Sequence, residues 1–187
     1  MTSWFNKLRD YFPAQEMKSQ PHMLALLNEK RGQYKVIEEA NYVIVYLEKE
    51  DYIFVDFMLV TGGHRSRGIG SQVIEQLKRQ GKPIILEVEP VTATDIDTEK
   101  RVKFYKKLDF KLFPEIRYVR THTVTGLLNI MDVYCWSPVP VTMEWVYQRM
   151  AESYEQVHAY RAQDFYGQPP QTADEVLRLE VPAKSMS

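Results

Sequence analysis

The chain has 187 residues, which fits one domain or one domain with an appendage. Its 24 Lys and Arg residues nearly balance its 25 Asp and Glu residues, so the composition gives no indication of a nucleic-acid-binding protein. Apolar residues make up 44% and charged residues 26%, values that are typical of a globular protein and exclude general disorder.

The N-terminal third predicts two helices followed by strands. Apolar residues at helical spacing predict a helix over residues 4–12, ended by Pro13, and a second over about 21–31, ended by Gly32. Residues 34–40 give a weak strand signal, whereas 42–47 and 52–60 are dense in β-branched and aromatic residues. Because only four charged residues join the last two strands, we expect an antiparallel hairpin.

The middle of the chain predicts a βαβ unit. A loop with glycines and arginines, residues 61–70, leads into a helix that Gly81 and Pro83 end. A strand over residues 84–89 comes next. Two strands joined through a helix run parallel, so the strands at 52–60 and 84–89 should be parallel.

The rest of the chain predicts a helix, two strands and a helical extension. The helix covers residues 98–108 and is capped by Asp97 or Thr98, and the strands cover 110–121 and 127–136. After a proline-containing break, residues 141–161 form a helix with one apolar face, made of Met143, Val146, Tyr147, Met150, Tyr154 and Val157. The tail after Phe165 is expected to be loosely ordered. We therefore divide the chain into a domain at residues 1–136, complete with its last strand, and an extension at 137–187.

Several classes of site and location are not expected. No apolar run reaches the about twenty residues of a membrane helix, and the N-terminus lacks a signal-peptide core, so we expect a cytoplasmic protein that is not in the membrane. The single cysteine, Cys135, fits a reducing compartment and a packed thiol. The four histidines lack zinc-like spacing, so no metal site is expected.

The loop between the parallel strands carries the clearest chemical signal. Residues 65–70 read R-x-x-G-x-G directly before a helix. Glycines allow close backbone approach, and the unpaired N–H groups at a helix start favour an anion, so the loop suits a phosphate or pyrophosphate. A glycine-rich turn with solvated arginines is the alternative. A Rossmann fingerprint would need a glycine where Val73 stands, and the P-loop sequence is absent.

Two stretches resemble the GNAT acyltransferase family. Arg65-Ser66-Arg67-Gly68-Ile69-Gly70-Ser71 resembles its pyrophosphate loop, Q/R-x-x-G-x-G/A. Phe104-Tyr105-Lys106-Lys107-Leu108-Asp109-Phe110 resembles its F-Y-x-K-x-G-F stretch. The resemblance covers roughly residues 34–136. It implies an α/β fold with a mixed, mostly antiparallel sheet that is splayed between its fourth and fifth strands, here 52–60 and 84–89, and flanked by helices.

The resemblance also implies a cofactor and its site. Acetyl-CoA would be the co-substrate, without a metal, and its pantetheine arm would pair with the strand backbone while its pyrophosphate rests on the helix N-terminus. Tyr105 would protonate the departing thiolate, although a packed aromatic side chain is the alternative. The implied cofactor-binding residues are Met58, Leu59, Val60, Arg65, Ser66, Arg67, Gly68, Ile69, Gly70 and Ser71.

Three positions depart from the family pattern. Asp109 stands where a glycine is expected, and Thr98 replaces an asparagine that the family often has near the start of that helix. Phe54 stands where some protein-acetylating members carry a glutamate base. These departures leave the identity of the base open.

Carboxylates on the strand at 84–89 are the best candidates for that base. Glu87 and Glu89 share one face of the strand, and the other face is apolar. A carboxylate on an interior strand must face water or a site, so either this face is wet or it borders the cleft. Glu87 is the first choice, Glu89 the alternative and Asp56 a weaker candidate.

Together these patterns predict an acetyl-CoA-dependent N-acetyltransferase that acts by direct attack of an amine. The acceptor would be a small molecule or a peptide, and neither a nucleic acid nor a membrane is an expected partner. A non-catalytic acyl-CoA-binding or regulatory module and a phosphate-binding α/β enzyme unrelated to CoA are the alternatives.

The apolar face of the extension helix must pack on the core, on the acceptor groove or on a second subunit in a homodimer. If this helix forms a wall of the acceptor groove, the net acidic character of the extension would favour a cationic amine.

Overall fold

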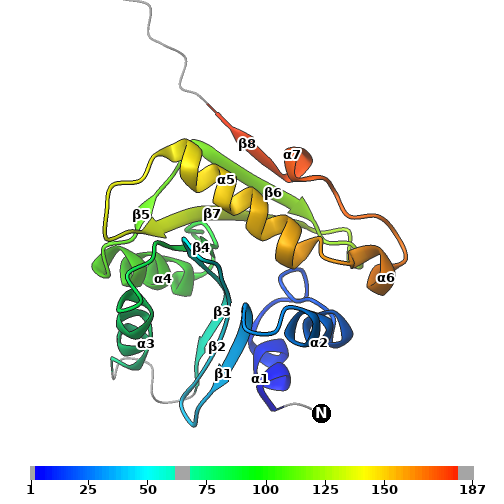
Figure 1. Cartoon of the computed structure of the whole chain (residues 1–187), viewed down its shortest axis with the longest axis horizontal. Coiled ribbons are helices and arrows are strands. Elements are labelled where there is room, and N and C mark those ends of the chain that lie inside the picture. Colours follow the sequence, from blue (N-terminus) through cyan, green and yellow to red (C-terminus); the bar gives the residue numbers. More distant parts are fainter. Residues whose placement is uncertain (1–2, 62–67, 181–187) are drawn as a thin grey trace, which may run out of the picture.

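The structure of the chain is a computed structural model that describes residues 3–61 and 68–180. Three residues of the expected pyrophosphate loop, Arg65, Ser66 and Arg67, lie outside these ranges. Within them, helices flank one eight-stranded sheet with the strand order β1-β2-β3-β4-β7-β6-β8, and β5 pairs with β7. Figure 1 shows helices on both sides of this sheet.

The secondary-structure elements of the described ranges have defined bounds. The strands are β1 (Tyr34–Glu38), β2 (Tyr42–Glu48), β3 (Ile53–Val60), β4 (Ile84–Val88), β5 (Lys111–Leu112), β6 (Ile116–Thr121), β7 (Leu128–Trp136) and β8 (Leu177–Leu179). The helices are α1 (Ser3–Tyr11), α2 (Gln20–Glu29), α3 (Ile69–Lys78), α4 (Ile96–Lys107), α5 (Met143–Ser153), α6 (Ala162–Tyr166) and α7 (Ala173–Val176). A π-helical turn, Tyr154–His158, comes directly after α5.

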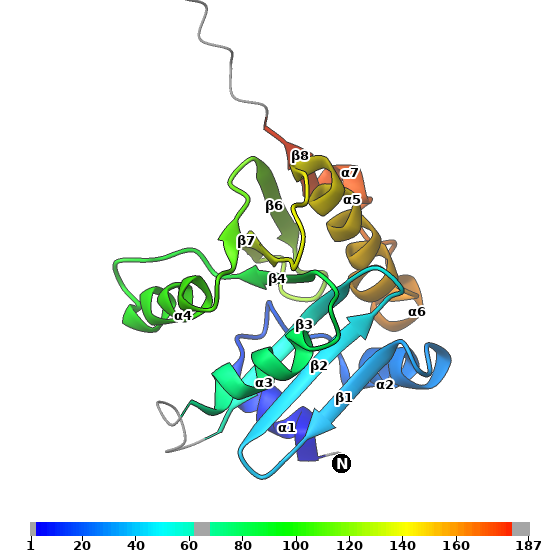
Figure 2. The ribbon, with the colours of Figure 1, turned by 60° about the vertical axis from the view of Figure 1, so that its left-hand side comes forward.

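The sheet separates between β3 and β4, which confirms the expected splay. These parallel strands pair at only three positions, from Ile53 with Ile84 to Val55 with Leu86. Beyond them β3 continues along β2, whereas β4 continues along β7. Figure 2 shows β1, β2 and β3 turned away from β4 and β7.

A β-bulge marks the point at which the two strands separate. Val45 of β2 faces Phe57 and the next residue, Tyr46, faces Val55, so Asp56 is the extra residue on β3. A bulge bends its strand and increases the local twist, and bulges are common next to active sites. Because the last β3–β4 pair is also at Val55, the bulge and the opening of the sheet coincide.

Two hydrophobic cores lie on the two faces of the sheet. On one face, α1, α2 and α5 pack on side chains of β2 and β3, and the buried residues include Leu8, Met23, Leu26, Phe54, Val146 and Met150. On the other face, α3 and α4 pack on the strands, and the buried residues include Val73, Ile74, Leu77, Ile84, Leu86 and Val102. The alternation of β4, with Ile84, Leu86 and Val88 on one face, agrees with the expected pattern.

The helix that carries Tyr105 begins earlier than the sequence predicted. Its N-cap is Asp95, whose side chain accepts a hydrogen bond from the Asp97 backbone N–H at 2.9 Å. The expectation that Asp97 or Thr98 is the cap is therefore wrong. Thr98 is buried instead, and its hydroxyl donates to the Asp95 carbonyl oxygen at 2.6 Å and accepts from the Thr92 N–H at 3.0 Å.

The other end of α4 explains the glycine of the family pattern. Asp109 comes after the helix with a φ of 61°, in the left-handed region that favours glycine. Aspartate tolerates this region better than most residues, so the departure at Asp109 preserves the turn.

Two predictions for the second half need correction. The strand expected over residues 110–121 is split into β5 and β6, because Pro114 between them has no N–H to continue the ladder. The tail after Phe165 is ordered over residues 171–180, where Thr172 and Glu175 form a capping box at the start of α7. The next strand, β8, then pairs with β6.

The extension therefore belongs to the same packed body as the rest of the chain. The side chains of Val146, Met150 and Val157 are fully buried in the core that they share with α1 and α2. The apolar face of the predicted helix thus packs on its own chain. The expectation that the sheet is complete at Trp136 is wrong, since β8 adds an edge strand from the extension. Among the helices of the described ranges, none is long and apolar enough to cross a membrane.

Candidate active site

A cavity of about 470 Å³ lies where β3 and β4 separate. Side chains and backbone from β3, the start of α3, β4 and α4 line it, and they include Met58, Val60, Gly70, Glu87 and Tyr105. It thus brings together four of the segments that the sequence singled out. Leu59, the third predicted strand residue, points its side chain into the core on the other face, which leaves only its backbone near the opening.

The start of α3 forms one end of this cavity. Gly68, Ile69, Gly70 and Ser71 all line it. Gly68 is the N-cap, with a φ of 77° and no side chain that could cap the helix, so the first amides of α3 are available to an anion. Gly70 also meets a packing requirement, because a Cβ there would lie 3.1 Å from the Cζ atom of Phe104 on α4.

Tyr105 is held rigidly on α4 beside the cavity. It is 7% exposed, and its ring makes edge-to-face contacts with Phe104 and Phe110 at centroid distances of 5.1 and 5.5 Å. Burial raises the pKa of Tyr105 to about 12, so its hydroxyl is protonated at neutral pH. A protonated hydroxyl is what a group that donates to a leaving thiolate requires.

Glu87 is a buried carboxylate of the cavity, which Glu16, Asp56 and Asp97 also line. Its side chain is 10% exposed, and its Oε1 atom lies 2.8 Å from the Nε2 atom of His158. Burial raises the pKa of Glu87, while the positive charges of Arg120 and Lys18 oppose this rise. A carboxylate with a raised pKa is a stronger base than an exposed one, which suits proton abstraction.

The other two carboxylates that the sequence singled out are engaged in ion pairs. Glu89 lies just past the end of β4, and its Oε2 atom is 3.4 Å from the Nη1 atom of Arg101. Asp56 accepts hydrogen bonds from the Lys18 ammonium at 2.6 and 2.8 Å and one from the Tyr34 hydroxyl. With side chains only 4% and 2% exposed, Lys18 and Asp56 form a buried ion pair at the bulge.

Two residues beside Glu87, His158 and Arg120, carry no signal in the sequence. His158, on the π-helical turn, lies between Glu87 and Arg120 of β6, whose Nη1 atom is 2.9 Å from the His158 Nδ1 atom. His158 and Glu87 are 71 positions apart, and no motif or periodicity in the sequence connects them. Only the docking of the extension on the sheet brings these residues together.

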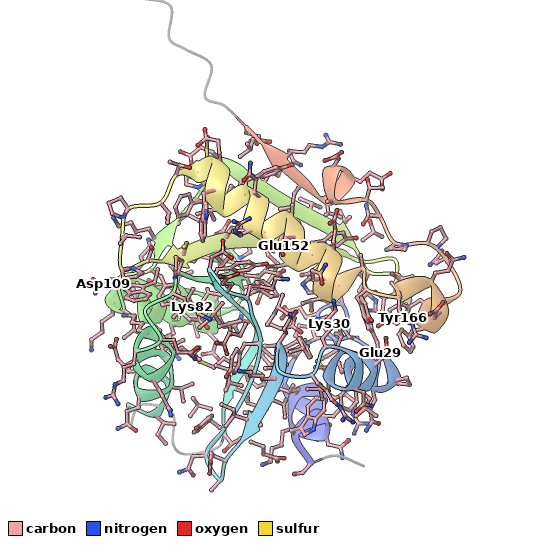
Figure 3. The ribbon with its side chains drawn as sticks, viewed as in Figure 1. Glu29, Lys30, Lys82, Asp109, Glu152 and Tyr166 are labelled. Carbon is pink, nitrogen blue, oxygen red and sulfur yellow. The ribbon has the colours of Figure 1, made fainter. Side chains whose placement is uncertain are left out.

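A second cavity, of about 270 Å³, shares Arg120 and His158 with the first. It is lined by the connection before α2, the β6–β7 hairpin, and residues of the extension, which include Tyr154, Tyr166 and Gln171. Figure 3 shows Tyr166 of α6 beside α2, where its hydroxyl accepts from the Ser19 backbone N–H at 2.9 Å. The extension thus forms a wall of this cavity as well as part of the core.

Comparisons with known proteins agree with this geometry. Residues 2–110 match the model of the acetyltransferase (GNAT) family. A candidate acetyltransferase of Bacillus subtilis (strain 168), YjbC, is 40% identical over 177 residues, which cover 95% of this chain and 92% of that protein.

Two solved structures show the same fold at low sequence identity. A candidate acetyltransferase from the GNAT family of Bacteroides thetaiotaomicron superposes with a TM-score of 0.60 at 20% identity, over 86% of this chain and 88% of the other. An aminoglycoside 6'-N-acetyltransferase complexed with coenzyme A superposes with a TM-score of 0.51 at 13% identity, over 74% of this chain and 91% of the other.

Proposed function

The chain belongs to the GNAT acetyltransferase family, and we propose that it transfers the acetyl group of acetyl-CoA to the amine of a small molecule or peptide. The observation that carries this proposal is the cavity in the splayed sheet, which holds a helix N-terminus, a protonated tyrosine and a buried carboxylate together. The family supports acyl transfer to an amine. The cofactor, the residue roles and the acceptor are our inference.

Acetyl-CoA would lie along the opening between β3 and β4. Its pyrophosphate would accept hydrogen bonds from the amides at the start of α3, around Gly68 to Ser71, and from the arginine loop before them. The pantetheine arm would hydrogen-bond to the β3 backbone at Met58 to Val60. It would do so along the edge of β3 that no longer pairs with β4 beyond Val55. This placement directs the thioester towards Tyr105 and Glu87.

The acceptor amine needs a base before it can attack. An alkylamine has a pKa near 10.4, so only about one molecule in 10³ is neutral at pH 7, a cost of roughly 4–5 kcal/mol. Glu87 would take the proton from the ammonium group, directly or through water. The amine nitrogen then bonds to the thioester carbon, and backbone N–H groups of β3 near Met58 would stabilise the resulting oxyanion.

Collapse of the tetrahedral intermediate that carries this oxyanion completes the transfer. The carbon–sulfur bond breaks, the nitrogen loses its second proton, and the thiolate accepts a hydrogen bond or a proton from Tyr105. The products are an amide, CoA thiol and one proton released to solvent. No acyl-enzyme forms in this scheme, because the amine attacks the thioester directly.

The second cavity is the proposed route for the acceptor, since it reaches Glu87 through His158 and Arg120. Its lining within the described ranges contains no Asp or Glu. Two acidic groups of the extension pair elsewhere, Glu152 with Lys49 and Asp164 with Arg161. The net acidic character of the extension therefore gives no reason to expect a cationic acceptor.

Binding and turnover together test the proposal. Calorimetry should show that CoA and acetyl-CoA bind with similar affinity, whereas ADP alone binds more weakly because it lacks the pantetheine arm. Thiol release and mass spectrometry with a panel of amines and peptides should show acetylation, which Glu87→Gln should slow without changing CoA affinity. Tight binding of acetyl-CoA with no transfer to any amine would instead favour a non-catalytic acyl-CoA-binding module. Equal affinity for ADP and CoA would favour a nucleotide-binding enzyme unrelated to CoA.

A further inference from the structure

The imidazole of His158 bridges a cation and the proposed base. Its Nδ1 atom lies 2.9 Å from the Nη1 atom of Arg120, and its Nε2 atom lies 2.8 Å from the Oε1 atom of Glu87. The three residues come from the π-helical turn, β6 and β4. His158 and Arg120 also line both cavities, so this chain of hydrogen bonds stands at the junction between them.

The partners of His158 determine its tautomer. A guanidinium group has only donors, so the Nδ1 atom that faces Arg120 must be the acceptor and carries no hydrogen. The proton of the neutral ring is then on Nε2 and donates to Glu87. Burial and the nearby charges of Arg120 and Lys18 hold the pKa of His158 well below its usual range, which keeps the ring neutral.

We propose that His158 is a positioning residue for Glu87, which it orients through an Nε2–H donor that Arg120 fixes. The proposal rests on the proposed function of the cavity, in which Glu87 is the base. The donor occupies Oε1 of Glu87, so the proton from the acceptor ammonium would go to a remaining lone pair of the carboxylate. His158 itself neither gains nor loses a proton during the transfer.

The backbone around His158 is specialised for this placement. In the π-helical turn, the Ala159 N–H donates to the Tyr154 carbonyl oxygen at 2.9 Å, five residues back. A π-helical turn adds one residue to the helix and rotates the residues after it, and such turns are frequent at functional sites. Val157 therefore remains in the core while His158 next to it reaches Glu87.

Among the cations of the described residues, Arg120 opposes the raised pKa of Glu87 most strongly, followed by Lys18. Lys18 is paired with Asp56 through two hydrogen bonds. The groups that act on Glu87 or His158 come from the α1–α2 connection, α2, β3, β6 and the π-helical turn, and they are Glu16, Lys18, His22, Asp56, Tyr118, Arg120 and Tyr154. The His158 bridge thus transmits the stabilising effect of Arg120 to the ionised form of Glu87.

A matched pair of variants separates this role from simple packing. In His158→Gln the side-chain amide nitrogen can replace Nε2 and donate to Glu87. In His158→Asn the shorter amide can reach Arg120 but not Glu87. We expect the Gln variant to keep kcat within about threefold of the original, and the Asn variant to lose about tenfold or more with an unchanged KM for acetyl-CoA.

The pH profile gives a second readout in the same variants. Because the Asn variant removes a donor to the ionised carboxylate, the acid limb of its kcat profile should move to higher pH, whereas the limb of the Gln variant should not move. Equal kcat values and equal acid limbs in two folded variants would overturn the positioning role. Thermal melts establish that both variants are folded.

Nuclear magnetic resonance tests the inference without relying on turnover. Nitrogen-15 spectra of the original protein should show His158 as the neutral Nε2–H tautomer throughout the neutral pH range. Carbon-13 spectra should show a higher pKa for the Glu87 carboxyl in His158→Asn than in His158→Gln. An Nδ1–H tautomer, or a Glu87 pKa that is the same in both variants, would overturn the inference. If these spectra agree but no amine is acetylated, the proposed function fails while the placement of Glu87 by His158 stands.

Discussion

Replacing Tyr105 by phenylalanine tests how its hydroxyl helps the thiolate to leave. Burial raises the pKa of Tyr105 to about 12, whereas an alkyl thiol has a pKa of about 8.5. Complete proton transfer to the thiolate is therefore unfavourable by about 3.5 pKa units, or about 5 kcal/mol. A hydrogen bond from the neutral hydroxyl to the developing charge still contributes about 1.5–3 kcal/mol. The magnitudes favour a hydrogen-bond donor, with the thiolate protonated later from solvent.

The size of that contribution sets the expected result. Tyr105→Phe should lower kcat by about 10- to 150-fold, and KM for acetyl-CoA should change little because the interaction forms only as the sulfur becomes charged. The phenyl ring keeps its contacts with Phe104 and Phe110, so the melting temperature should stay close to that of the original protein. Thiol release with an acetylatable amine measures kcat. Tyr160→Phe, which removes a surface hydroxyl bonded to Glu29, is the matched control.

Two results would refute this reasoning. If kcat of Tyr105→Phe stays within threefold of the original, the tyrosine is a packing residue only. If the original enzyme has a basic limb at or below about pH 10 that Tyr105→Phe removes, the hydroxyl has an ordinary or lowered pKa, and proton transfer to the thiolate would cost much less than calculated above.

Three further predictions concern the cofactor end, the base and the buried ion pair. Gly70→Val should weaken CoA binding at least about tenfold in calorimetry, because its Cβ would lie 3.1 Å from Phe104 before the added methyl groups are counted; an unchanged affinity would contradict this. Glu87→Gln should slow turnover about 10²-fold or more and abolish the acid limb of the kcat pH profile. In the original protein this limb reflects loss of the ionised base as pH falls through the raised pKa of Glu87. An unaltered pH profile would exclude Glu87 as the base. Lys18→Met should reduce the free energy of unfolding by about 3–5 kcal/mol in urea titrations, since it leaves Asp56 buried without its cation; a loss under about 1 kcal/mol would mean that water replaces the ammonium.

The segments of the proposed cofactor side could be placed from the sequence because they are close along the chain. A strand, a glycine-containing loop and a helix succeed one another from Met58 to Ser71, and the local rules for strands and helix N-termini are sufficient to place them. Alternation along β4 likewise predicted which face Glu87 occupies. The role of Tyr105 stays a prediction, although its position in the cavity agrees with it.

The errors arose where tertiary contacts override local signals. The strand over residues 177–179 is too short to show a periodic pattern, and it forms because β6 offers it a free edge. The helix over 141–161 looked continuous because a π-helical turn has the same composition as an α-helix. The cap of α4 lies two or three residues before the predicted one, because capping preference alone does not fix a helix boundary more closely.

The proposed acceptor side differs from the proposed cofactor side in how its residues are assembled. Lys18 lies before α2, Arg120 lies on β6 and His158 lies on the extension, yet all three meet beside Glu87. Each alone reads as an ordinary solvated or buried polar residue, so no local pattern marks it. A site built from distant segments can change one segment at a time. The residues to vary in a search for the acceptor are therefore those of the second cavity, which the extension completes, rather than those of the glycine loop.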